Sequence, residues 1–271
     1  MKRRIIILFC LGFSISLFSQ NVLKIATFNI QNFGKSKLSS TAIIDTLSAI
    51  VRQFDIVAVQ EISDKSNSVT TAFLKKINKT GQYHYKVSTS KRTGEQTDDK
   101  SKQEQYAFYY NTDVVTLTNA LLYDDSKNDY FDREPYIAKF STKQDDLSFI
   151  ICTIHTVPEY AVKEIGALIH VAKWIPTKFN TCDNIIFCGD FNASCSYASP
   201  EQLEQLAIHK KPYNWIVADT TKTNLSQKTC AYDRFVVSDA LLPKIKGYQV
   251  LHYFKSKKVS DHWPVYIEIK Y

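Results

Sequence analysis

Nine polar residues with catalytic or metal-binding potential share one feature, because each lies at or beside the end of an apolar run. They are Asn29, Glu61, Glu104, His155, Asp190, Asn192, Asp233, Asp261 and His262. Carboxylate and amide oxygens bind hard divalent cations, and imidazole accepts or donates a proton near neutral pH. Any one of these residues could be a cap or turn residue. Together they supply the groups that metal-assisted hydrolysis of a phosphate ester requires.

The apolar runs beside these residues have the composition of β-strands. Strands are predicted at 22–30, 55–62, 83–90, 104–111, 113–123, 133–142, 147–156, 184–192, 230–238 and 262–271. Helical spacing of apolar residues predicts helices at 41–54, 69–78 and 158–179, the last with Pro158 in its first turn. Segments 31–37 and 91–103 are predicted as loops because they are polar and contain glycine.

Strands outnumber helices in this order, and most of them follow one another as hairpins. Two mixed sheets packed face to face, with helices on the outside, satisfy the pattern. The predicted fold class is therefore α+β, a four-layer sandwich. Composition does not change along the middle of the 271 residues, which favours one domain over two.

The first twenty residues differ from the rest. Lys2, Arg3 and Arg4 precede an uncharged apolar run from Ile5 to Phe18. This pattern predicts a secretory signal peptide at 1–20 and a mature chain at 21–271, with an uncleaved anchor as the alternative. The mature protein is therefore expected to be secreted or periplasmic, with no stable membrane association. Loss of the three basic residues takes the net charge from +7 to +4, which is compatible with a polyanionic ligand.

Five cysteines remain in the predicted mature chain: Cys152, Cys182, Cys188, Cys195 and Cys230. An odd number in an oxidising compartment leaves at least one thiol unpaired. Cys152 and Cys188 lie inside apolar runs and are expected to be buried and inert. The spacings among the five cysteines match no zinc site.

Several motifs together resemble one known family. "TFNIQNFG", "VQEI", "GDFNASCSY", "CAYDRFVV" and "SDHWPV" are similar to the metal-dependent endonuclease/exonuclease/phosphatase superfamily, and "REPYIAKF", "CSY" and "CAYDR" narrow the resemblance to its deoxyribonuclease I family. The resemblance runs from about Leu23 to the C-terminus. It implies the same four-layer fold and a divalent-metal-dependent endonuclease.

The resemblance also implies roles at single positions. It implies His155 and His262 as catalytic histidines, paired with Glu104 and Asp233 respectively. Glu61, Asp190, Asp261 and Asn29 match residues around the metal, which would be Mg²⁺ or Mn²⁺. Asn192, Arg133 and Tyr197 match residues that contact phosphate or substrate, and Asp125 and Asp129 resemble a structural Ca²⁺ site. It implies a disulfide between Cys195 and Cys230, with two free thiols as the alternative.

Such pairs have a direct physical purpose. A phosphodiester is an anion and repels hydroxide, so a divalent cation offsets that charge. A histidine held by a carboxylate takes a proton from water, while a second histidine protonates the leaving 3′ oxygen. His84, His170, His209 and His252 match no motif and are interpreted as structural or surface residues.

Two positions depart from the family pattern. Ser63 and Lys102 stand where the family has an arginine and a tyrosine that enter the DNA minor groove. Lys102 could still neutralise phosphate, together with Lys91, Arg92 and Lys100, although a solvated loop explains the same charges.

The implied substrate is double-stranded DNA, cut by a monomer to give 5′-phosphate ends. Two other functions remain open. One is a superfamily phosphodiesterase acting on a lipid or small phosphate ester, and the other is a non-enzymatic binding or toxin subunit on the same scaffold. The catalytic set is complete, which disfavours the second alternative.

Overall fold

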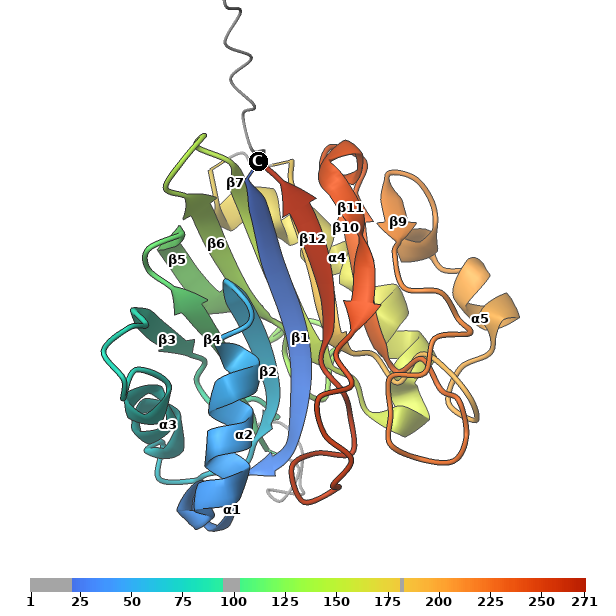
Figure 1. Ribbon diagram of the computed structural model, residues 1–271. Helices are drawn as coiled ribbons and strands as arrows, with labels where there is room; N and C mark the ends of the chain where they lie inside the picture. The colour runs from blue at the N-terminus through green and yellow to red at the C-terminus, as the bar shows by residue number, and fades with distance from the viewer. Residues whose placement is uncertain (1–20, 95–102, 181–182) are drawn as a thin grey trace, which may run out of the picture.

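The computed structural model describes residues 21–94, 103–180 and 183–271. The predicted signal peptide, Lys102 and Cys182 lie outside these ranges. Two six-stranded sheets form the centre of the molecule (Figure 1). The first has the order β11-β12-β1-β2-β4-β3, with β1 (Val22–Phe33), β2 (Ile56–Ile62), β3 (Tyr85–Thr89), β4 (Gln105–Asn111), β11 (Ile245–Val250) and β12 (Val265–Lys270). The second has the order β5-β6-β7-β8-β10-β9, with β5 (Val115–Leu122), β6 (Tyr136–Thr142), β7 (Ser148–His155), β8 (Ile185–Asp190), β9 (Tyr213–Trp215) and β10 (Asp233–Ser238).

Each sheet contains one parallel pair next to antiparallel neighbours. β1 runs parallel to β2, and β7 runs parallel to β8. A helix lies between the two strands of each pair in the sequence: α2 (Thr41–Val51) and α4 (Ala161–Lys178). Because parallel strands end at the same edge and antiparallel neighbours begin there, one edge of each sheet collects residues from many segments.

Apolar side chains form three clusters, one between each pair of neighbouring layers. Phe108, Phe140 and Ile267 belong to the cluster between the two sheets. Ile44 and Leu47 of α2, together with Phe73 of α3 (Val69–Ile77), pack on the outer face of the first sheet, while α4 covers the second sheet (Figure 1). Helix, sheet, sheet and helix make four layers, so the predicted fold class is confirmed.

Four short elements differ from the sequence prediction. The predicted loop 31–37 contains the start of α1 (Lys35–Ser39), a helix with no buried residue, so no apolar periodicity marks it. α5 (Pro200–Glu204) was also missed, although Ser199 and Gln202 form a capping box at its start. β9 and β11 lack fully buried residues, and strands without an apolar run leave no sequence signal. Within the described ranges, no helix is long and apolar enough to cross a membrane.

Candidate active site

The strand register gathers the predicted catalytic residues at one edge. His155 is paired with Asp190 across β7 and β8, and Asp190 is paired with Asp233 across β8 and β10. Asn29 of β1 reaches across from the first sheet. Its Nδ2 donates to Asp190 Oδ2 at 3.0 Å and to Glu61 Oε1 at 2.8 Å. Both sheets therefore contribute to a single site.

The Nδ1 side of the His155 ring is held by a carboxylate. Its Nδ1 lies 3.0 Å and 3.1 Å from the two oxygens of Glu104, the residue before β4. Burial of the ring and the Arg133 charge lower the pKa of His155, but the Glu104 and Asp190 carboxylates outweigh them and raise it above its usual value. Because Nδ1 is occupied, Nε2 is the nitrogen that faces the site.

His262 repeats this arrangement from the other side. Its Nδ1 lies 2.8 Å from Asp233 Oδ2, at the start of β10. Burial lowers the pKa of His262, but Asp233 and Asp190 outweigh it and raise the pKa to about 10. Ser260 fixes the segment, since its hydroxyl donates to the Asn29 carbonyl at 2.7 Å and accepts from His262 N at 3.1 Å.

The two free imidazole nitrogens converge on one oxygen. Asp190 Oδ2 lies 3.6 Å from His155 Nε2 and 3.5 Å from His262 Nε2. Burial raises the pKa of Asp190, but the two histidines outweigh it and keep the pKa below its usual value. Two imidazole nitrogens thus flank a single carboxylate oxygen, and paired imidazoles of this kind are groups that can transfer protons near neutral pH.

Arg133 is more buried than a residue that contacts DNA would be. It is 7% exposed, and its guanidinium donates to the carbonyls of His155 and Thr156, each at 2.9 Å. Its Nε also lies 3.8 Å from Glu104 Oε1. In the structure Arg133 therefore orients the first histidine pair, and its contact with DNA stays a prediction. Arg133 still lines a cleft of about 180 Å³ with Asn32, Glu61, Ser63, Gln103, Glu104 and His155.

Asn192 and Tyr197 lie on the other flank. Asn192 Nδ2 donates to the Thr156 carbonyl at 2.9 Å, and its backbone N–H donates to Asp190 Oδ1 at 3.1 Å. Tyr197 is 39% exposed, with its ring centroid 5.7 Å from that of Tyr232. Tyr197 is accessible to a substrate, whereas Asn192 is buried and uses one of its amide N–H groups to bind the Thr156 carbonyl.

Two carboxylate groups could hold a divalent cation. Asp190, Asp233 and His262 offer ligand atoms within 4.8 Å of one another. Asp233 is fully buried and its Oδ2 is bound to His262, while its Oδ1 has no hydrogen-bond partner among the described residues. The predicted group around Glu61 and Asp190 is more open, because Glu61 is only partly buried. Mg²⁺ keeps several of its waters, which favours the open group. Asp261 has a buried side-chain oxygen with no hydrogen-bond partner among the described residues, as a ligand to an ion would.

Glu164 is a site residue that the sequence reading missed. On α4 it shares the buried face with Ile165 and Leu168, and a carboxylate within an apolar stripe was the available signal. Its two oxygens accept from Asp132 N at 2.8 Å and Val157 N at 2.7 Å. Glu164 thus ties the segment carrying Arg133 to the segment that follows His155.

The stability of the protein should depend on pH through Glu164. Burial raises its pKa from 4.5 to about 7, against the two backbone donors and Arg133. The folded state therefore binds the proton more tightly, and the resulting stability is complete below about pH 4 and lost as pH rises to about 7. The difference in unfolding free energy between wild type and Glu164→Gln should fall by on the order of 3 kcal/mol over that range. Urea titrations at several pH values measure it, and parallel curves for the two proteins would refute it.

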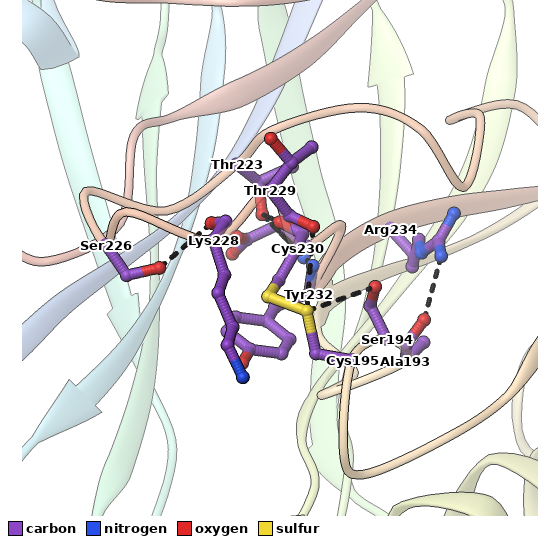
Figure 2. The surroundings of a disulfide bond; sticks show 11 residues. Ala193, Ser194, Cys195, Thr223, Ser226, Lys228, Thr229, Cys230, Tyr232 and Arg234 are labelled. Carbon is purple, nitrogen blue, oxygen red and sulfur yellow. Dashed lines mark hydrogen bonds between the residues drawn. A yellow bond between two sulfur atoms is a disulfide. The ribbon is translucent and has the colours of Figure 1, made fainter.

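A disulfide joins two segments of the site (Figure 2). Cys195, after β8, is bonded to Cys230, before β10, with a Cα–Cα distance of 5.6 Å. Figure 2 also shows Arg234, whose Nη2 donates to the Ala193 carbonyl at 2.8 Å. Both links fix the loop after Asp190 against the strand that carries Asp233. Cys152 and Cys188 are buried free thiols.

Removing this disulfide should destabilise the fold. The cross-link spans a sequence separation of 35 residues, and closing a loop of that size contributes roughly 2–4 kcal/mol, mostly by restricting the unfolded chain. Cys195→Ala/Cys230→Ala should lose that much unfolding free energy in guanidinium titrations. Wild type under reductant serves as the matched control and should lose a similar amount. Equal midpoints for oxidised wild type and the double variant would exclude a stabilising bond.

The predicted Ca²⁺ loop has one feature that fits an ion. Asp125 is 3% exposed, and its Oδ2 accepts from Phe131 N at 2.8 Å. Its Oδ1 is buried without a hydrogen-bond partner among the described residues. Asp129 is exposed and donates its backbone N–H to the Asp125 carbonyl at 3.0 Å.

Comparison with known sequences identifies relatives over most of the chain. A model described as "Endonuclease/Exonuclease/phosphatase family" matches residues 26–262. Deoxyribonuclease-1 of Gallus gallus is 33% identical over 265 residues, which is 92% of each chain. Deoxyribonuclease-1 of Homo sapiens is 33% identical over 267 residues, again 92% of each. Human deoxyribonuclease gamma is 30% identical and covers 94% of this chain and 88% of its own.

Solved structures share the fold at lower sequence identity. An endonuclease/exonuclease/phosphatase family protein from Bacteroides thetaiotaomicron superposes with a TM-score of 0.63 at 17% identity, over 92% of this chain and 98% of its own. A humanized D. rerio TDP2 gives 0.63 at 14% identity, over 92% and 99%. With a family match across most of its length and relatives at 33% identity, the chain belongs to the endonuclease/exonuclease/phosphatase family and, within it, to the deoxyribonuclease I group.

Proposed function

We propose that the protein is a divalent-metal-dependent endonuclease that hydrolyses DNA. The observation that carries this is the convergence of two carboxylate-held histidines on Asp190, with Nε2–Oδ2 distances of 3.6 Å and 3.5 Å. The relatives at 33% identity are named deoxyribonuclease-1, which points to DNA as the substrate.

The two histidines divide the proton transfers between them. One imidazole accepts a proton from the attacking water, and the other donates a proton to the leaving 3′ oxygen. The phosphorus–O3′ bond breaks, so the products carry a 3′-hydroxyl and a 5′-phosphate. Glu104 and Asp233 orient the rings and stabilise each imidazolium. Asn192, Arg133 and Tyr197 are proposed to contact the substrate, as is Lys102, which lies outside the described residues.

Mg²⁺ or Mn²⁺ is proposed at Glu61, Asp190, Asp261 and Asn29, where it would offset the charge of the scissile phosphate. Carboxylate oxygens suit both hard cations. The Asn29 amide, whose Nδ2 donates to Glu61 and Asp190 and whose Oδ1 accepts from Gln31 N, would orient these two carboxylates beside the ion. Ca²⁺ is proposed at Asp125 and Asp129, supported by the unpartnered Asp125 oxygen. Secretion is proposed from the N-terminal pattern at 1–20 and from the disulfide, which persists in oxidising compartments. A monomeric state is proposed from the family resemblance alone.

A substrate panel tests this function. Plasmid DNA, single-stranded DNA, RNA, phosphoinositide vesicles and bis(p-nitrophenyl) phosphate are compared at one enzyme concentration with Mg²⁺. We expect fastest cleavage of duplex DNA, with ends that a ligase joins because they carry 5′-phosphates. Faster turnover of the phosphoinositide or the small ester would favour the other phosphodiesterase function, and no turnover of any substrate would favour a binding subunit.

A further inference from the structure

We propose that a basic groove beside the active site binds a backbone phosphate of the DNA strand, away from the phosphate that is cut. This inference rests on the proposed function. The groove has a volume of about 500 Å³ and lies between α1 and the loop that joins β11 to β12. It is lined by Gln31, Asn32, Ser36, Lys37, Ser40, Ile43, Lys257 and Lys258.

The lining of the groove carries positive charge, with the Glu61 and Asp261 carboxylates near Lys37 at one end. Three of its lining residues are lysines and none is acidic. Lys257 and Lys258 are exposed. Within the described parts of the chain, neither of them forms an ion pair or donates a side-chain hydrogen bond to the protein. Both ammonium groups are therefore available to an anion.

Lys37 stabilises the walls of the groove and has no donor left to bind a phosphate. Its Nζ donates to the carbonyls of Ile30, Gln31 and Val259 at 2.7, 2.6 and 2.9 Å, which uses all three of its donors. These bonds join α1 and the end of β1 to the β11–β12 loop. The backbone that carries the two exposed lysines is thereby held opposite the α1 side of the groove.

The β11–β12 loop is held to the core at further points. Trp263 Nε1 donates to the Phe254 carbonyl at 2.8 Å, and the Phe254 ring centroid lies 6.1 Å from that of Phe28. Val259 N donates to the Ser256 carbonyl at 3.0 Å, closing the turn that carries both lysines. A positioned loop loses less conformational freedom on binding than a free tail would.

The groove and the catalytic cleft share one lining residue, Asn32. Its backbone N–H donates to Glu61 Oε2 at 2.8 Å. A DNA strand with its scissile phosphate between the two histidines can thus continue past Asn32 into the groove. A lysine is a mobile point charge, so Lys257 and Lys258 should neutralise phosphate at any base sequence.

The salt dependence of DNA binding tests the inference. A fluorescent duplex with cleavage-resistant phosphorothioate linkages is titrated with wild type, Lys257→Ala/Lys258→Ala and Lys173→Ala/Lys178→Ala at several salt concentrations with constant Mg²⁺. The last variant removes the same charge from exposed positions on α4, the opposite helical layer. Each phosphate contact contributes about 0.9 to the slope of log K against log salt. We expect the slope to become shallower by roughly 1–2 in the groove variant only.

An unchanged slope in Lys257→Ala/Lys258→Ala, or an equal change in the α4 control, would overturn the inference. A second measurement distinguishes failure of the groove inference from failure of the proposed function. The ratio of plasmid cleavage to bis(p-nitrophenyl) phosphate hydrolysis should fall about tenfold or more in the groove variant, because the small ester cannot reach the groove. If wild type cleaves DNA and this ratio is unchanged, the groove inference fails alone. If wild type cleaves no DNA, the proposed function fails, and the binding slope still decides the groove.

Discussion

His155→Ala and His262→Ala should each lower the rate of DNA cleavage at least a hundredfold. Each histidine performs one proton transfer, and such a transfer contributes roughly 10²–10⁴ in rate. Each ring is buried, with 8% and 7% of its residue exposed, so its Nε2 cannot be replaced freely by solvent. Initial rates of plasmid nicking with Mg²⁺ measure the effect.

His84→Ala is the matched control. His84 is exposed and pairs with Asp113 at 2.8 Å, outside the catalytic cleft. It should cleave DNA at the wild-type rate. If a folded His155 or His262 variant also retained near wild-type turnover, the assignment of acid–base catalysis to that histidine would be wrong.

Asp190→Asn should have an effect of similar size for a different reason. The amide keeps the shape of the side chain but removes the negative charge on which both Nε2 atoms and Asn29 converge. Removal of one preorganised group that stabilises the transition state electrostatically costs roughly 10²–10³ in rate. We expect this loss together with weaker Mn²⁺ binding, measured by calorimetry on the same protein.

Asp124→Asn provides the comparison, since Asp124 is exposed and bonds only to Ser126 among the described side chains. Its Mn²⁺ affinity at the catalytic site should equal that of wild type. Wild-type cleavage and wild-type Mn²⁺ affinity in Asp190→Asn would remove Asp190 from both the catalytic and the metal-binding group.

The strands that bear the site could be predicted from sequence because each is an apolar run with a polar end. β7 and β8 are buried along nearly their whole length and end at His155 and Asp190. α1, β9 and β11 could not be predicted, because their stability comes from partners and not from their own pattern. Lys37 illustrates this: its contact with Val259 spans a sequence separation of 222 residues.

The identities of the site residues followed from motifs, but their geometry did not. The convergence of His155 and His262 on one oxygen of Asp190 depends on the register of three strands, which no motif encodes. Glu164 accepts hydrogen bonds from the backbone N–H groups of Asp132 and Val157, which belong to no motif. Its function could therefore be found only from the contacts in the structure. The groove at Lys257 and Lys258 depends in the same way on two distant loops.

The most direct test of the central claim is conversion of supercoiled plasmid by the purified protein with Mg²⁺, with EDTA, and with Mg²⁺ restored after EDTA. We expect nicked and then linear DNA with Mg²⁺, no conversion with EDTA, and recovery when Mg²⁺ is restored, because the carboxylates around Asp190 need a cation to accept an anionic phosphate. Intact plasmid under all three conditions, or equal cleavage in EDTA, would contradict it.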